Sequence, residues 1–316
     1  YHIPLFFFIS GYLFKPQNTL AGKGRLLQKK IKTQLVPYYM LAIIFAVLTT
    51  LLKAININRG GNFSWQTILG DGFFYNNTYS LFGTCWFLFA LFFVNMIAIM
   101  LYQKTKWFDI TIAVLSMVYM IKYFSLPQGA ILAKYVPFMA KLSICFLFFS
   151  GGYLFKLFEH KLKKHLLSPI SIVIIFFVVL LIFQLAENTP YDIAGVNFGQ
   201  AQNKELFNVC TTFGIIFIVY IISYHVSHIL SDRSMLWMIS ENTFSIMAWH
   251  FTFFLLAHYI LFQLGFVEYA NLSDKAYRFS PDKFMPVYLI VGIFGPVFLA
   301  LGYRKLRRGL WQLVFH

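Results

Sequence analysis

Two histidines occupy positions where an imidazole could act as a general base. His2 stands at the start of a strongly apolar run, just before Pro4, and His250 lies seven residues inside another apolar run. Imidazole takes up a proton near neutral pH, which suits the removal of a proton from a hydroxyl group. We therefore expect His2 and His250 to be catalytic. The alternatives are an interfacial His2 that anchors its helix and a His250 that bonds to a backbone carbonyl.

The densest basic cluster of the chain follows the first apolar run and consists of Arg25, Lys29, Lys30 and Lys32. Cations beside a membrane helix normally set its orientation and contact anionic lipids. The same charges could hold the phosphates of a nucleotide, and the two roles are compatible. The chain has no Walker loop and no GxGxxG motif, so its sequence does not support ATP or a dinucleotide as the ligand.

The composition is that of an integral membrane protein. The 316 residues are 59% hydrophobic and 12% charged, whereas about a quarter of a soluble domain is charged. A net charge of +15 could indicate nucleic acid as a partner, but the cations lie in short segments between apolar runs, which excludes that class. Cys85, Cys145 and Cys210 have no metal-ligand spacing and sit in or beside apolar runs, so we expect neither a metal site nor a disulfide framework.

Nine apolar runs are interpreted as the helices that must position these residues, and the fourth of them is short. A helix needs about 20 apolar residues to cross a bilayer core of ~30 Å. The sequence therefore predicts an all-α, polytopic transmembrane helical bundle, with residues 1–316 as a single domain. The runs are 2–14, 35–53, 84–102, 108–122, 137–157, 168–186, 207–230, 243–263 and 285–303.

Lysine and arginine predict the orientation of these helices. Seventeen of the 26 cations fall in segments on one side of the predicted membrane and eight on the other. The positive-inside rule makes the first side cytoplasmic, including the loop 15–34 and the C-terminus. The longest predicted loops, 54–83, 187–206 and 264–284, then face outward. The first run then travels from outside to inside. A further helix before Tyr1 is therefore expected, which would give ten helices in the cell membrane.

The first apolar run has a second copy in the chain. HIPLFFFISGYLFK at residues 2–15 returns as FFSGGYLFK at residues 148–156. Both copies are predicted to run from outside to inside, so this would be a parallel repeat. The small residues Ser10-Gly11 and Ser150-Gly151-Gly152 within the copies would let two helices approach closely in lipid.

Four segments in order resemble the type-3 membrane acyltransferase family. They are the first run, RLLQKKIKTQLVPYY at 25–39, CWFLFALF at 85–92 and ENTFSIMAWHF at 241–251. The chain is most similar to the fucose 4-O-acetylase-like branch, which acetylates sugars of bacterial surface or secreted glycans. The resemblance implies ten helices, acetyl-CoA used from the cytoplasm, and a glycan or lipid-linked sugar as the acceptor. It also implies an arginine and a catalytic histidine on the helix before Tyr1.

The resemblance adds substrate contacts to two residues that have plainer explanations. Trp86 opens the third run at its outer end, where an aromatic belt would place it; the family match raises a stacking surface for a sugar ring. Ser10 would allow close helix packing, or would leave room for the pantetheine arm of CoA. Ser10 has no acid or base beside it and is not expected to be a nucleophile.

We therefore expect transfer of an acetyl group from acetyl-CoA to a glycan hydroxyl, with membrane lipids around the protein and no metal. The first alternative is a transporter or flippase for a lipid-linked glycan, which buried carboxylates would favour. The second is a non-enzymatic scaffold in a glycan export complex. The acceptor sugar, the acyl chain length and the oligomeric state stay open.

Overall fold

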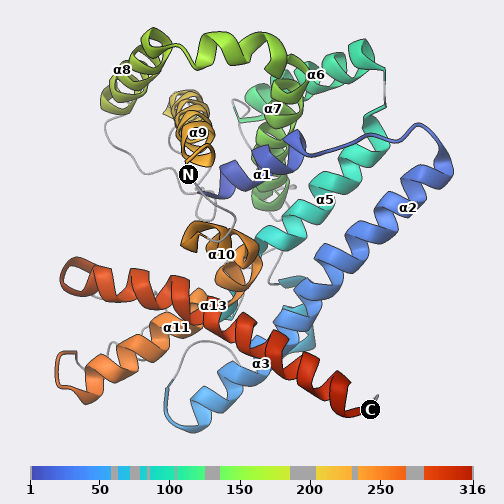
Figure 1. Cartoon of the computed structure of the whole chain (residues 1–316). Helices are drawn as coiled ribbons and strands as arrows, with labels where there is room; N and C mark the ends of the chain where they lie inside the picture. Colours follow the sequence, from blue (N-terminus) through green and yellow to red (C-terminus); the bar gives the residue numbers. More distant parts are fainter. Residues whose placement is uncertain are drawn as a thin grey trace. The chain divides into compact units, whose positions relative to one another are not determined.

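The computed structural model of the chain consists of helices (Figure 1). It describes residues 2–57, 63–71, 79–83, 86–103, 105–124, 136–185, 204–229, 234–267 and 281–314. The part of the chain that it describes contains no β-strand, which confirms the all-α prediction. Much of the predicted outer loops 54–83, 187–206 and 264–284 lies outside the described residues.

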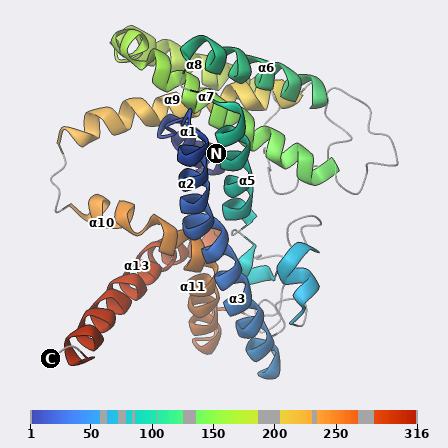
Figure 2. The same cartoon turned by 90° about the vertical axis from the view of Figure 1, so that its right-hand side faces the viewer.

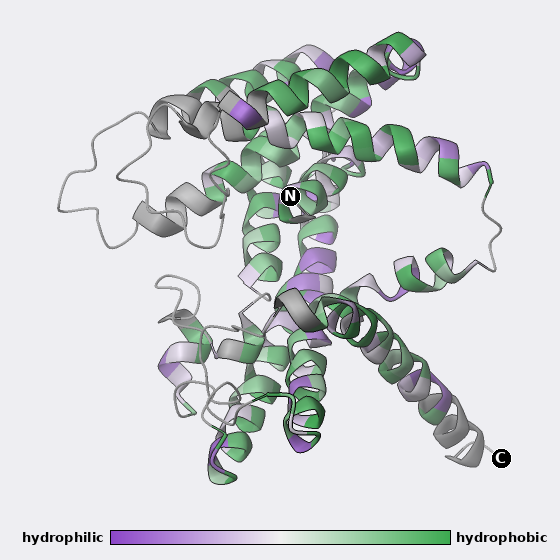
Figure 3. Ribbon diagram, turned by 90° about the vertical axis from the view of Figure 1, so that its left-hand side faces the viewer, coloured by the Kyte–Doolittle hydropathy of each residue, from purple (hydrophilic) through white to green (hydrophobic). Residues whose placement is uncertain are grey.

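Each of the nine apolar runs coincides with a helix, and run 243–263 has the same bounds as its helix. The matching helices are α1 (His2–Tyr12), α3 (Val36–Ala54), α5 (Trp86–Leu101), α6 (Lys106–Phe124), α7 (Val136–Leu166), α8 (Pro169–Leu185), α9 (Lys204–Ser227), α11 (Thr243–Gln263) and α13 (Pro281–Val314). Among the described residues, five helices are long and apolar enough to cross a membrane. Figure 3 shows that hydrophobic residues cover most of these helices. The chain is thus a membrane helical bundle.

Segment 15–34 was expected to be a loop, and this prediction is wrong for most of its length. Helix α2 (Leu20–Lys30) and the π-helical turn η1 (Ile31–Leu35) continue into α3 as one helix of 35 residues (Figure 2). The Thr19 hydroxyl caps this helix by accepting a hydrogen bond from Gly22 N at 3.1 Å. Pro37 has no N–H for the carbonyl one turn earlier, and the wider π turn stands just before it.

Two further helices extend past their predicted ends, and one short helix was not expected. Helix α7 reaches Leu166 rather than residue 157, and α13 reaches Val314 rather than residue 303. Lysine and arginine are good helix formers, so their charge marks where a helix leaves lipid and not where it ends. The short helix α10 (Met235–Glu241) begins at Ser234, whose side chain accepts a hydrogen bond from Trp237 N.

The chain divides into two compact units. Unit 1 holds α1, α2, η1, α5 from Phe87 on, and α6 to α9. Unit 2 holds α3 from Pro37 on, the short turns η2 (Thr67–Asp71) and η3 (Ser80–Phe82), and α10, α11 and α13. The assignment of residues 1–316 to a single domain stays a prediction.

Within unit 1, helices α1, α5, α7 and α9 run in the same direction. They match the first, third, fifth and seventh predicted runs, and alternate runs of a polytopic protein cross the membrane in the same direction. Residues early in one helix contact residues early in the next, and residues late in one contact residues late in the next. Helix α1 meets α5 through Phe7 with Phe87 and Phe14 with Tyr102. Helix α7 meets α9 through Phe148 with Phe213, and Glu159 of α7 contacts Tyr12 of α1 and Tyr220 of α9. Helix α6 runs the other way, since Lys106 at its start lies over Phe158 near the end of α7. The segments predicted to share one side of the membrane therefore meet at one end of unit 1.

The two copies of the repeat pack against each other through their glycines. A Cβ added to Gly11 would lie 1.9 Å from the Phe149 carbonyl oxygen, and a Cβ added to Gly152 would lie 1.9 Å from the Phe8 carbonyl oxygen. Phe8 and Phe149 are equivalent positions of the repeat, as are Gly11 and Gly152. Helices α1 and α7 thus make the same contact in both directions. This crossing is filled by backbone, so Gly11 and Gly152 serve the close packing of α1 against α7.

In unit 2, helices α11 and α13 lie side by side and antiparallel (Figure 1). The rings of Phe253 and Phe254 lie where side chains on Gly295 and Gly292 would stand. The Ser245 hydroxyl donates to the Pro296 carbonyl at 2.8 Å. These contacts fix the register of α11, the helix that carries His250.

Candidate functional site

The C-terminal ends of α1, α7 and α9 are joined by one carboxylate. Tyr12 donates its hydroxyl to one Glu159 oxygen at 2.7 Å, and Tyr220 donates to the other at 2.9 Å. One turn earlier on α7, the Lys156 ammonium donates to the Phe14 carbonyl at 2.6 Å. Hydrogen bonds to a charged group are about twice as strong as neutral ones. The end of unit 1 that carries the cations is therefore held together by hydrogen bonds between α1, α7 and α9.

A second carboxylate is buried near this end. Asp109 is 1% exposed and accepts hydrogen bonds from the Tyr153 hydroxyl at 2.6 Å and from Gln103 N. Next to it, the Tyr102 and Ser150 hydroxyls are 2.8 Å apart. Both Asp109 oxygens have donors, so the network ties α6 and the end of α5 to α7.

Asp109 and Glu159 were not singled out from the sequence as candidate site residues. Each stands at a charged end of its run, where an acid looks solvated. Their tyrosine partners belong to apolar runs and were counted as hydrophobic. One signal was present: a carboxylate spaced three residues from a lysine, as in Lys106 and Asp109 or Lys156 and Glu159, at a predicted helix end.

His250 lies on α11 with its ring held by its own helix. Its Nδ1 is 2.9 Å from the Ile246 carbonyl oxygen and 3.1 Å from the Met247 carbonyl oxygen. Two carbonyls can only accept, so Nδ1 carries a proton and, in the neutral ring, Nε2 keeps a lone pair. The ring is half-buried against Phe251 and Phe254. The expected backbone bond is present, and it leaves Nε2 in the state that a general base requires.

A second histidine on α11, His258, is fully buried. His258 is 0% exposed, and its Nδ1 lies 2.6 Å from the Tyr288 hydroxyl of α13. Ala257 and Leu261 pack with Tyr288 in one buried cluster. Near the other end of the pair, Arg304 donates to the buried amide oxygen of Asn242. These polar contacts hold α11 and its neighbours together in unit 2.

The structure describes the other predicted site residues as follows. His2 is the first residue of α1, and its side chain lies outside the described part. Ser10 is half-buried one residue before the Gly11 crossing, and Trp86 is the first residue of α5 and is 7% exposed. The roles of His2, Ser10, Trp86 and His250 in catalysis or substrate binding stay predictions.

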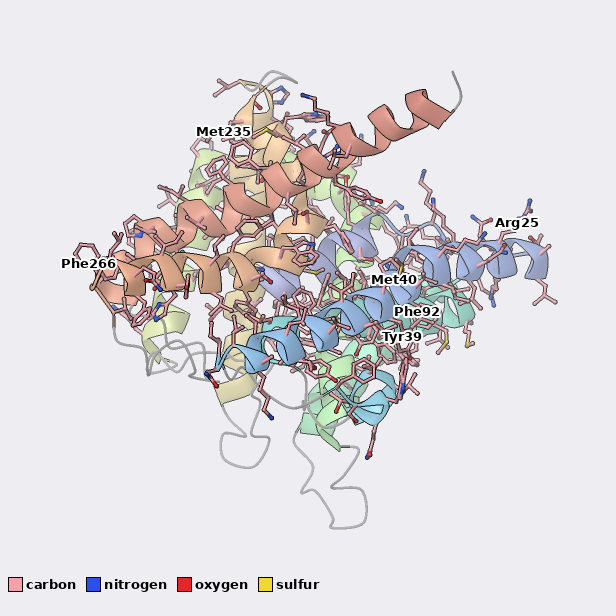
Figure 4. The ribbon with its side chains drawn as sticks, turned by 90° about the horizontal axis from the view of Figure 1, so that it is seen from below. Arg25, Tyr39, Met40, Phe92, Met235 and Phe266 are labelled. Atoms are coloured by element: carbon pink, nitrogen blue, oxygen red, sulfur yellow. The ribbon has the colours of Figure 1, made fainter. Side chains whose placement is uncertain are left out.

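Three of the four predicted cofactor-binding residues share a helix face. Arg25, Lys29 and Lys32 are exposed on α2 and η1, and spacings of four and three residues place them in one stripe. Lys30 lies off this stripe and is half-buried. Figure 4 shows the Arg25 side chain pointing away from its helix. The stripe is therefore accessible to a ligand. The described residues hold no group of three or more His, Cys, Asp or Glu that could bind a metal ion.

Removing the tyrosine hydroxyls from Glu159 is expected to loosen unit 1. Tyr12→Phe and Tyr220→Phe should each lower the free energy of unfolding by about 1.5–3 kcal/mol, since each deletes a hydrogen bond to a charged group. Tyr224→Phe is the control, because the Tyr224 ring packs under Lys163 and its hydroxyl has no hydrogen-bond partner among the described residues. Denaturant unfolding of the detergent-solubilised protein measures this. Equal effects of all three changes would contradict the role of Glu159.

The chain matches a known protein family. A family model described as Acyltransferase domain matches residues 1–309, which is almost the whole chain. No curated protein and no solved structure matches significantly.

Proposed function

The chain belongs to the type-3 acyltransferase family, and we propose that it transfers an acetyl group from acetyl-CoA to a hydroxyl group of a surface or secreted glycan. The family match over residues 1–309 carries this proposal. Acyl transfer by a protein with several membrane helices follows from the family and the fold. The acetyl donor, the glycan acceptor and the likeness to fucose 4-O-acetylases rest on the four sequence segments.

His250 is the base that the geometry of α11 supports best. Its Nε2 lone pair would take the proton from the acceptor hydroxyl as that oxygen attacks the thioester carbonyl. The new ester forms as the C–S bond breaks, and the proton passes to the departing CoA thiolate. His2 would assist from the start of α1, with Trp86 and Ser10 contacting substrate. An imidazole in a position shielded from bulk water can do this at neutral pH.

The donor would approach from the cytoplasm and the acceptor from outside, on a free glycan or a lipid carrier. The meeting of α1, α5, α7 and α9 at one cation-rich end of unit 1 supports a common cytoplasmic side in the cell membrane. Reporter fusions at Lys23 and after His316 should both report the cytoplasm. A reporter signal from outside at either position would reverse this map.

Removing the basic stripe should weaken donor binding. In the variant Arg25→Gln/Lys29→Gln/Lys32→Gln, each lost charge-assisted contact should cost about 1.5–3 kcal/mol of acetyl-CoA affinity. Lys30→Gln tests the fourth residue. Lys161→Gln/Lys164→Gln is the control, because these two lysines are exposed on α7 outside the stripe. Calorimetric titration with acetyl-CoA measures the effect. Unchanged affinity in the triple variant would leave the stripe as a topology signal.

The direct test in cells is the ester content of surface glycan. Cells that produce the full-length protein should carry O-acetyl groups that mild base removes, and cells without it should not. A transporter or flippase would change the amount of glycan outside and not its acetylation. Asp109 and Glu159, which could suggest transport, both have their oxygens occupied by hydrogen-bond donors. Family membership therefore favours acyl transfer over transport.

A further inference from the structure

A line of direct side-chain contacts runs along α11 and ends on His250. The Phe254 and His250 rings meet edge to face at 84°, with 5.5 Å between their centres. Phe254 also contacts the Tyr288 ring of α13, whose centre is 5.8 Å away. The Tyr288 hydroxyl in turn lies 2.6 Å from Nδ1 of His258. Both helices belong to unit 2, so the whole line lies within one compact unit.

The end of this line that is far from His250 is firmly held. His258 is 0% exposed and Tyr288 is 6% exposed. Breaking the hydrogen bond between them would leave two buried polar groups that water cannot reach, which is costly. Tyr288 also packs with Ala257 and Leu261 in a buried cluster, and Phe254 packs against that cluster. The Phe254 ring is therefore fixed by its neighbours on both helices.

Gly292 of α13 makes room for the Phe254 ring. A Cβ added to Gly292 would stand less than 3.0 Å from this ring, a distance that real Cβ atoms do not show. A larger residue at position 292 must therefore displace the ring. Because the ring packs directly against His250, its displacement would be passed on to the imidazole.

The imidazole of His250 has three kinds of support. The Ile246 and Met247 carbonyls hold Nδ1. The Phe251 ring packs 4.3 Å from the imidazole, centre to centre, and the Phe254 ring adds the contact from the side of α13. No residue in the described part of the chain bonds to Nε2. These contacts together determine where the lone pair of Nε2 points.

We propose that Phe254, in the space left by Gly292 and against Tyr288, positions the imidazole of His250 for its task as a general base. Phe254 and Gly292 are thus positioning residues that act through His250. The inference rests on the proposed function for the task of His250, whereas the contacts do not depend on it. A misplacement of about 1 Å can slow a reaction about 100-fold, so a fixed imidazole matters for the rate.

The test compares Gly292→Ala with Gly295→Ala in the purified full-length protein. The two changes are matched, because a Cβ on Gly295 would also stand less than 3.0 Å from a ring of α11, that of Phe253. Among the described residues, no ring contact joins Phe253 to His250. Both variants should lower the midpoint of thermal unfolding to a similar extent. Gly292→Ala alone should lower kcat about tenfold or more, with the KM for acetyl-CoA within about twofold.

Nitrogen NMR of protein labelled in its histidines reads the imidazole directly. The His250 signals are assigned by their absence in His250→Ala. The unchanged protein should show one protonated and one unprotonated ring nitrogen for His250, as its Nδ1 bonds require. Gly292→Ala should shift these signals, and Gly295→Ala should leave them in place. Equal shifts in both variants, or no shift in either, would overturn the positioning role.

Phe254→Leu separates packing from positioning. By itself it should shift the His250 signals and lower kcat about tenfold, so the test does not depend on the accumulation of Gly292→Ala. Leucine has no ring for the added methyl group to meet, so Gly292→Ala/Phe254→Leu should unfold at a higher temperature than Gly292→Ala. Its kcat should stay as low as that of Phe254→Leu, because both changes act on the same ring. Recovery of kcat together with stability would show that Phe254 only fills space.

The NMR measurement needs no acceptor and no catalysis. His250 signals that respond to Gly292→Ala and not to Gly295→Ala, in a protein that transfers no acetyl group, would contradict the proposed function alone. Acetyl transfer that requires His250 but is slowed equally by the two glycine variants would contradict the positioning role alone.

Discussion

Replacing Gly11 or Gly152 with alanine is expected to disrupt the packing of α1 against α7. The added Cβ would stand 1.9 Å from a backbone carbonyl oxygen in either case, so the helices must separate. Overpacking a close contact costs about 1–3 kcal/mol, and a backbone neighbour cannot turn aside as a side chain can. We expect each variant to lose stability by at least this amount and the double variant to accumulate poorly. The measurement is the midpoint of thermal unfolding in detergent.

Gly24 provides a matched control with the opposite sign. It lies inside α2, and an added Cβ would meet nothing within 4 Å. Alanine is a better helix former than glycine by about 1 kcal/mol, so Gly24→Ala should leave stability unchanged or raise it slightly. If Gly11→Ala and Gly152→Ala behaved like Gly24→Ala, the direct contact of the two repeat copies would be refuted.

Replacing His250 with alanine is expected to abolish acetyl transfer at normal expression. General base catalysis contributes about 10²–10⁴ in rate, and the Nδ1 bonds of His250 leave Nε2 with a lone pair for this task. The variant should still bind acetyl-CoA, because the basic stripe is untouched. His165→Ala is the control, since His165 is exposed at the end of α7. Full activity in His250→Ala would remove His250 from the site and move the base to another helix.

The position of each membrane helix could be predicted from the sequence, because crossing a bilayer demands a long apolar run. The start of α11 at Thr243 and its end at Gln263 agree with the predicted run. The direction of the helices in unit 1 was predictable for a different reason, because lysine and arginine mark the cytoplasmic side of the membrane. The limits of α2 and α7 were not, because polar residues such as Lys29 and Lys163 continue a helix as readily as apolar ones.

The polar contacts of the candidate site were much harder to predict. His250 stood out as an ionisable residue in an apolar run. His258 lies in the same run and was overlooked. Its partner Tyr288 belongs to another helix, α13, and the sequence does not show that the two side chains meet. Glu159 became informative only when α1 and α9 brought Tyr12 and Tyr220 to it. Such pairs depend on which helices are neighbours, and hydropathy carries no information about that.

The most direct measurement is acetyl transfer by the purified full-length protein in vesicles. Acetyl-CoA labelled in its acetyl group is supplied on the side of the basic stripe, and a glycan acceptor on the opposite side. Label should appear in the acceptor as a base-labile ester, with one free CoA thiol released for each ester formed. Movement of unmodified glycan across the bilayer without consumption of acetyl-CoA would contradict acyl transfer and support a transporter.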